Sequence, residues 1–96
     1  MIEKYEARRI KQEIGLILWE VWDPIGVNSY PQARGEYGFY VNPVYIMLTD
    51  GSTDSRIALY LLTIATDRMG LSGPTLDDMV PTVKALRKIQ IPKDTA

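Results

Sequence analysis

The stretch Leu18-Trp19-Glu20-Val21-Trp22-Asp23-Pro24-Ile25-Gly26-Val27 marks the point where the first helical pattern of this chain stops. Before it, apolar residues recur at steps of three and four, as on one face of an amphipathic helix. These residues are Ile10, Ile14, Ile17 and Val21, flanked by Leu18 and Trp22. Asp23-Pro24 ends the helix, because proline disfavours the α conformation in the residue before it. The stretch therefore predicts a helix over residues 2–22 and a structured loop after it.

The residue types in this loop suit a structural role. We expect Trp22 and Ile25 to hold the loop against the core, and Gly26 to adopt a positive φ. The Asp23 carboxylate is expected to accept hydrogen bonds from the backbone N–H groups of Ile25 or Gly26 in an Asx-turn. The predicted structural loop comprises Trp19, Trp22, Asp23, Pro24, Ile25 and Gly26. On this interpretation the stretch is a helix stop and not an active site.

Residues 31–49 carry a helical pattern that is interrupted at Asn42-Pro43. We expect a short helix up to about Tyr40, then a break or kink, then a second piece that ends at Leu48, since proline is disfavoured inside a helix.

The second half of the chain predicts two more helices. One follows an N-cap at residues 52–53 and ends at Gly70, in a position where glycine commonly closes a helix. The other covers most of residues 75–91. No segment alternates between apolar and polar residues as a strand does. The chain is therefore predicted to be all-α, a compact bundle of four to five helices in a single domain, residues 1–96, with residues 92–96 as a frayed tail.

The composition is that of a folded domain. The chain has 96 residues, of which 46% are hydrophobic and 24% charged, which is enough for one core without cross-links. The predicted core comprises Ile10, Ile14, Ile17, Val21, Val44, Leu48, Ile57, Leu61, Ile64 and Met79.

Two absences in the sequence narrow the chemistry. The chain contains neither cysteine nor histidine, which excludes disulfides and thiolate nucleophiles and removes the usual general base near neutral pH. The net charge of −1 gives no field that attracts nucleic acid or anionic lipid, so neither is an expected partner. Residues 1–15 contain no long apolar run, so we expect no signal peptide or membrane span and a soluble, cytoplasmic protein. No cofactor is expected.

Aromatic residues gather after the loop. Four of them are candidates for binding a partner, because they cannot all share the core-facing side of one helix: Tyr37, Phe39, Tyr40 and Tyr45. Tyrosine and other aromatic residues are enriched at protein–protein contacts, where they bury large areas. The alternative is that these rings rim the core with their hydroxyl groups in water. We expect at least two of the four rings to be partly exposed.

Three acidic residues could serve a different chemistry. Glu20 and Asp23 lie three positions apart, and Glu36 follows in the next segment. Three oxygen donors could hold Mg²⁺ or Ca²⁺. However, the metal-binding loop pattern of alternating aspartates is absent, and paired acids are common on helix surfaces. We therefore predict no metal ligand and no catalytic residue.

The order of several motifs resembles a group of small bacterial helical proteins of unknown function. The motifs are, in chain order, Trp22-Asp23-Pro24-Ile25-Gly26, Glu36-Tyr37, Asp50-Gly51 and Met69-Gly70-Leu71. The resemblance covers about residues 15–71, and this chain departs from the pattern at Gly38 and at Asn42-Pro43. It implies a small helical bacterial protein and carries over no catalytic residues. Immunity proteins for bacterial toxins include small acidic helical proteins, so the resemblance suggests an immunity-type role by analogy.

These observations favour a non-catalytic protein-binding module whose partner is another protein, such as a bacterial toxin, or a second copy of the chain in a homodimer. One alternative is a small carboxylate-dependent enzyme that uses Mg²⁺ or Ca²⁺ and takes Glu20, Asp23 or Glu36 as its base. Another is a purely structural domain that forms homo-oligomers.

Overall fold

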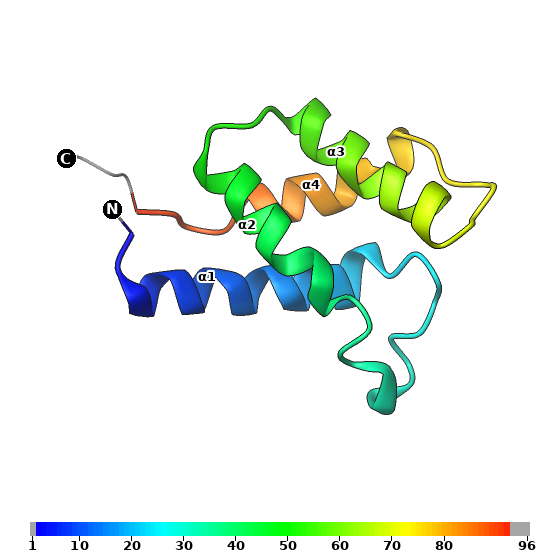
Figure 1. Ribbon diagram of the computed structural model, residues 1–96, viewed down its shortest axis with the longest axis horizontal. Coiled ribbons are helices and arrows are strands. Elements are labelled where there is room, and N and C mark those ends of the chain that lie inside the picture. Colours follow the sequence, from blue (N-terminus) through cyan, green and yellow to red (C-terminus); the bar gives the residue numbers. More distant parts are fainter. Residues whose placement is uncertain (1, 93–96) are drawn as a thin grey trace.

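The computed structural model describes residues 2–92, which form an all-α helical bundle. Within these residues there are four α-helices and no strand: α1 (Lys4–Ile17), α2 (Val41–Thr49), α3 (Asp54–Thr63) and α4 (Val80–Arg87). Two π-helical turns, η1 (Leu18–Trp22) and η4 (Ile64–Arg68), extend α1 and α3, and three short 3₁₀ turns are η2 (Pro31–Ala33), η3 (Gly38–Tyr40) and η5 (Asp77–Met79). Residues 23–40 leave the bundle and return to α2 (Figure 1). The frayed tail predicted for residues 92–96 falls, apart from Pro92, outside the described residues.

The buried side of α1 differs from the predicted stripe near its end. Ile10 and Ile14 are buried as predicted, but Leu18 continues the stripe, and Val21 is 44% exposed. The buried residues of this stripe follow one another in steps of four. In an α-helix each step of four turns about 40° more than a full turn, so a stripe with this spacing drifts around the helix unless the turns become wider. The turn therefore widens at η1, where the N–H of Asp23 donates to the carbonyl of Leu18, five residues earlier. The prediction that Val21 belongs to the core is wrong, and Ile17 lies only half-buried beside it.

The segment after the loop also differs from its prediction. Instead of a helix up to about Tyr40, residues 31–40 form two 3₁₀ turns joined by further turns. The α-helix begins only at Val41, which places Pro43 in its first turn. The N–H groups of a first turn have no partner within the helix, so proline is tolerated there. Pro43 thus stands near the start of a helix instead of breaking one.

The boundaries of α3 and α4 follow the sequence signals. The hydroxyl of Thr53 accepts a hydrogen bond from the N–H of Arg56 and caps α3. Gly70 follows η4 with a φ of 72°, the left-handed conformation in which glycine closes helices. Pro81 lies in the first turn of α4.

The core lies between α1, α3 and α4, with α2 packed on α1. Its fully buried side chains are Ile10, Ile14, Leu18, Val44, Ile57, Leu61, Thr82 and Leu86. Eight of the predicted core residues are buried: Ile10, Ile14, Val44, Leu48, Ile57, Leu61, Ile64 and Met79. Within the described residues, no helix is both long and apolar enough to span a bilayer.

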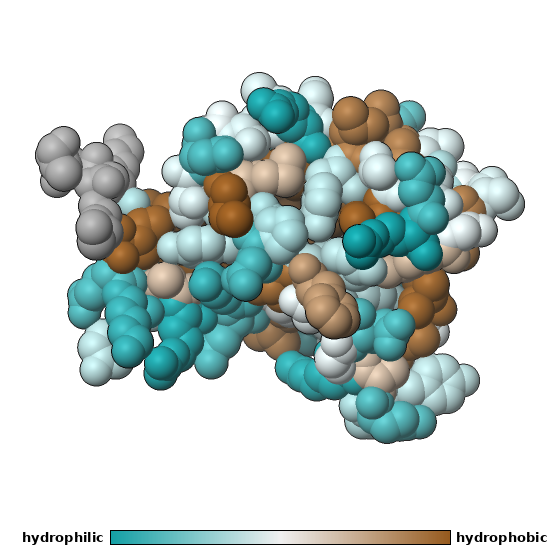
Figure 2. Space-filling model, viewed as in Figure 1, coloured by the Kyte–Doolittle hydropathy of each residue, from teal (hydrophilic) through white to brown (hydrophobic). Residues whose placement is uncertain are grey.

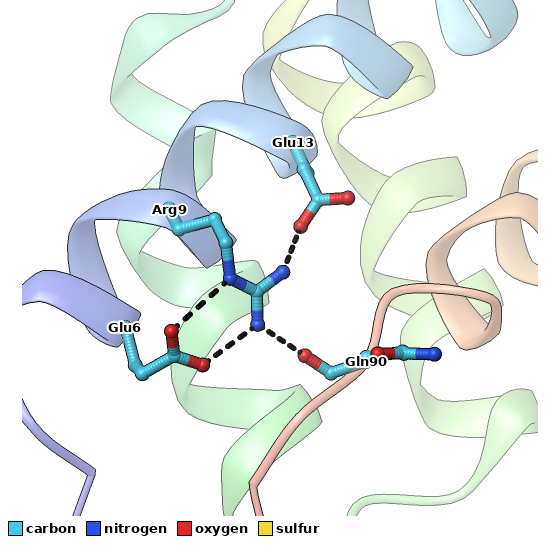
Figure 3. A network of polar contacts seen from close by, with 4 residues as sticks. All are labelled: Glu6, Arg9, Glu13 and Gln90. Carbon is cyan, nitrogen blue, oxygen red and sulfur yellow. Dashed lines mark hydrogen bonds and ion pairs between the residues drawn. The ribbon is translucent and has the colours of Figure 1, made fainter.

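Two arginines fasten the ends of the bundle. The Arg9 guanidinium contacts the carboxylates of Glu6 and Glu13 and also donates to the backbone carbonyl of Gln90, which ties the segment after α4 to α1 (Figure 3). Arg87 contacts the Asp54 carboxylate and the carbonyl of Ser52, and so ties α4 to the start of α3.

Candidate functional site

Three buried aromatic rings fix the loop excursion to the bundle. Trp19 and Trp22 come from η1, the turn that extends α1, and Tyr37 comes from the returning arm of the loop. The ring centroid of Tyr37 lies 6.2 Å from that of Trp19 and 5.3 Å from that of Trp22. All three rings are at least nine-tenths buried. This aromatic hub anchors residues 23–40 at both ends, so the residues next to Tyr37 are held in place.

The Asp23 carboxylate is the polar centre of this loop. It accepts hydrogen bonds from the N–H groups of Val27 and Asn28, at 2.8 and 3.2 Å, and from the hydroxyl of Tyr37, at 2.6 Å. The predicted role of Asp23 as an acceptor for backbone N–H groups is therefore confirmed, but the predicted donors are wrong. The N–H of Ile25 donates to the Tyr37 hydroxyl, at 3.4 Å, and that of Gly26 donates to the backbone carbonyl of Asp23.

The apolar side chain that holds the loop against the core is not the predicted one. Gly26 has the expected positive φ of 64°, whereas Ile25, expected to hold the loop against the core, is 37% exposed. Val27 packs against the core instead, together with Tyr37. Burial raises the pKa of the Tyr37 hydroxyl above its ordinary value, and the hydrogen bond to the Asp23 carboxylate raises it further. The hydroxyl therefore stays protonated and donates to Asp23.

The four candidate aromatic residues separate into different environments. Tyr37 is 3% exposed, so it is not one of the exposed rings among the four candidates. Phe39 is 86% exposed, and Tyr40 and Tyr45 are half-buried, so the expectation of at least two partly exposed rings is confirmed. Tyr40 packs edge-on against Trp22, with ring centroids 5.8 Å apart. The Nζ atom of Lys11 lies over the Tyr45 ring, 4.9 Å from the ring centroid. This cation–π contact joins α1 to α2.

One hollow in the surface is lined by Phe39, and a second is lined by the residue before it. Phe39 lines one of about 510 Å³ together with Glu36, Tyr40 and Arg68. Its neighbour Gly38 lines another of about 420 Å³, whose other lining residues are Gln12, Gly15, Leu16, Trp19, Arg34, Tyr37 and Val41. We call the exposed ring of Phe39 and these two hollows the Phe39 surface. Arg34 and Arg68 also line this surface, although no sequence pattern pointed to them, because Arg34 lies in the loop and Arg68 at the end of η4.

The three acidic candidates do not form a metal centre. The described residues contain no group of three or more carboxylate side chains arranged to hold a metal ion. Glu20 and Glu36 are exposed, while both carboxylate oxygens of Asp23 accept the hydrogen bonds described above. Asp23 therefore has a structural role in the loop.

Polar and apolar side chains alternate over much of the visible surface, and hydrophilic residues gather along the N-terminal part of α1 (Figure 2).

The chain matches no protein-family model, no curated protein and no solved structure. The resemblance to a group of small bacterial proteins therefore stays a prediction from the sequence motifs.

Proposed function

We propose that this protein is a non-catalytic protein-binding module and that its contact surface centres on Phe39. The observation that carries the proposal is the 86% exposure of the Phe39 side chain, on a segment whose neighbouring Tyr37 is 3% exposed. A large apolar ring in water has its most favourable place in an interface with another protein.

The anchoring of the segment supports the same proposal. A binding residue contributes most when it is already held in position, because less conformational entropy is lost on association. Tyr37 packs on Trp19 and Trp22 only two residues before Phe39, and α2 begins two residues after it. Phe39 is thus presented by a rigid scaffold, as residues on functional loops commonly are. The hollow that Phe39 lines and the one beside Gly38 offer room for side chains of a partner.

The test is to replace Phe39 and to measure binding and stability separately. Because the ring makes few contacts within the chain, Phe39→Ala is expected to change the free energy of unfolding by no more than about 0.5 kcal/mol. It is expected to weaken binding to the partner by at least tenfold, or about 1.4 kcal/mol, as for a central aromatic contact. Tyr30→Ala is the matched control, because Tyr30 is 56% exposed in the same excursion and lines neither hollow.

Partners captured by the wild-type chain are purified, and their affinities for the wild type, for Phe39→Ala and for Tyr30→Ala are measured by calorimetry. Sedimentation equilibrium of both chains tests a second copy as the partner. Equal affinity of wild type and Phe39→Ala for every partner, together with equal self-association, contradicts the proposal. An immunity-type role is the finer form of the proposal, and a toxin gene beside this one in the genome would support it.

A further inference from the structure

A second surface lies along the outward side of α1. A hollow of about 410 Å³ is lined by Lys4, Ala7, Arg8, Lys11 and Gln12. Gln12 also lines the hollow of about 420 Å³ beside Gly38, so the two hollows adjoin at that residue. We call the two together the α1 groove. Its charged residues, among those described, are all basic: Lys4, Arg8, Lys11 and Arg34. The whole chain has a net charge of −1, so this groove carries a local excess of positive charge.

The acidic residues of α1 do not neutralise this groove. Glu6 and Glu13 lie on the side of α1 that faces the C-terminal segment, where Arg9 contacts both of them and Gln90 as well (Figure 3). None of the residues that line the two hollows is an acid. The charges of α1 are therefore sorted between two sides of the helix, one balanced by its own ion pairs and one basic.

The groove has a second feature, an apolar end. Leu16 is 42% exposed there, beside Gly15 and Val41. Lys4, Arg8, Gln12 and Leu16 form one row along the helix at steps of four, which spans about 18 Å at 1.5 Å per residue. Side chains four residues apart form the ridges on a helix surface, and a second helix packs into the grooves beside such ridges.

From these features we infer that the α1 groove binds an amphipathic helix of a partner protein, with acidic side chains against Lys4 and Arg8 and an apolar side chain beside Leu16. The inference rests on the proposed protein-binding function and names the chemistry of the partner. Complementary charge gives such a contact its specificity and its speed of association. The apolar end gives the helix an anchor, as in other helix-in-groove contacts.

Nucleic acid and anionic lipid fit the groove less well. Affinity for nucleic acid rests largely on contacts with phosphate groups. A protein whose binding depends strongly on salt makes roughly 6–10 such contacts, about twice as many as the four basic residues of this groove provide. Binding to a membrane surface needs a continuous apolar face beside the basic one, whereas the exposed apolar side chain here stands at one end of the row. Both are retained as outcomes of the test.

The test uses a synthetic helical peptide of about 15 residues, long enough to follow this row. It carries glutamates along one face and two leucines at one end. The peptide is titrated into the ¹⁵N-labelled full chain, and amide shifts are followed by NMR. Shifts are expected at Arg8, Gln12 and Leu16, and affinity is expected to fall as salt is raised. A peptide with lysine in place of glutamate is expected to cause no shifts there.

Two matched variants locate the binding site. Arg8→Glu is expected to weaken binding of the acidic peptide by at least about tenfold, because it sets like charges against each other. Arg56→Glu makes the same change in net charge on α3, where Arg56 lines neither hollow. Glutamate is favourable three residues after the Thr53 cap, so this control is expected to fold and to bind like wild type.

The outcomes separate the inference from the proposed function. Loss of peptide binding in Arg8→Glu but not in Arg56→Glu supports the inference. No shifts along α1, equal loss in both variants, or binding to single-stranded DNA or phosphatidylserine vesicles in preference to the peptide overturns it. If natural partners need Phe39 but are indifferent to Arg8→Glu, the protein-binding function stands and the α1 groove is not its acidic-helix site. If the peptide binds the groove while Phe39→Ala leaves every partner unaffected, the Phe39 surface falls instead.

Discussion

Asp23 combines an unusual backbone conformation with three accepted hydrogen bonds. Its φ of 29° is the one positive value at a non-glycine position among the described residues. Aspartate and asparagine tolerate this region better than other residues because their short polar side chains bond to the local backbone. The carboxylate does so here with Val27 and Asn28, and it also accepts from Tyr37. One side chain therefore ends η1, shapes the loop and secures its returning arm.

Replacing Asp23 by asparagine is expected to lower the free energy of unfolding by about 1–2 kcal/mol, because one acceptor oxygen is kept and the other is lost. Asp23→Ala is expected to cost about 1–2 kcal/mol more, since alanine has no acceptor and is strained at positive φ. Urea unfolding followed by tryptophan fluorescence measures both. If the Asp23→Asn variant is fully stable but loses a bound divalent ion or a defined activity, the structural role of Asp23 is contradicted. That result would favour the alternative of a carboxylate-dependent enzyme.

The Tyr37 hydroxyl predicts a pH dependence at the alkaline end. Because its pKa is raised in the folded state, the unfolded chain releases this proton near the ordinary value of about 10 while the native chain keeps it. Stability is therefore retained below about pH 10 and falls above it, by up to about 1.4 kcal/mol per pH unit from this group. Tyr37→Phe should be less stable at pH 8 but should lose less stability between pH 10 and 11. Tyr5→Phe, at a 72% exposed position, serves as the control. Parallel pH profiles for wild type and Tyr37→Phe would contradict the assignment.

The sequence was informative about single residues where one residue type alone sets the local conformation. Gly26 has its predicted positive φ, and Asp23 accepts the predicted kind of hydrogen bond. The sequence did not predict that Tyr37 is buried and Phe39 exposed. Both residues lie in the same series of turns, and the difference is that Tyr37 contacts the two tryptophans and Phe39 does not. That difference is set by the path of the loop in three dimensions, which a local pattern does not contain.

At the level of elements, the helices that were predicted well are the amphipathic ones. The α1 and α3 patterns persist over several turns, so their burial follows from spacing alone, and only the widened turn at η1 shifted the last residues of the stripe. Residues 31–40 were wrongly predicted to be helical, since Pro31 and the spaced aromatics imitate a helix start. The contacts that Tyr37 makes with Asp23 and the two tryptophans favour tight turns there instead.

Gly15 offers a prediction about α1 as an element. A Cβ atom at this position would lie 3.9 Å from the Cγ2 atom of Val41, which is an ordinary contact distance. Glycine inside a helix costs roughly 0.5–1 kcal/mol relative to alanine, so Gly15→Ala is expected to raise the free energy of unfolding by about that amount. Gly26→Ala, at a φ of 64°, should lower it by about 1–2 kcal/mol. Chemical denaturation of both variants checks this, and a destabilising Gly15→Ala would mean that α2 packs more closely on α1 than the contact distance indicates.

At the scale of the whole molecule, the bundle is thin, with extents of 43 × 30 × 19 Å. A shape of this kind leaves much side-chain surface in water and makes the few fully buried residues important for stability. It also separates the two proposed contact regions from the core, because Phe39 and Arg8 are both exposed. Substitutions there can change binding while the bundle persists, which is the condition on which the tests of both proposals depend.

Buried core side chains and exposed ion pairs are therefore expected to contribute very unequally to the free energy of unfolding. Leu61 is fully buried, so Leu61→Ala removes apolar contacts and leaves a cavity, at a cost of about 2–5 kcal/mol. Arg87 joins α4 to α3 through Asp54, but both side chains are well exposed, at 36% and 69%, so Arg87→Ala is expected to cost no more than about 1 kcal/mol. The smaller loss should shrink further in high salt, where exposed ion pairs are screened, while the larger one should not. Urea unfolding at two salt concentrations distinguishes the two. A cost near zero for Leu61→Ala would mean that α3 presents its opposite side to the core, and the bundle described above would then be wrong in its central contact.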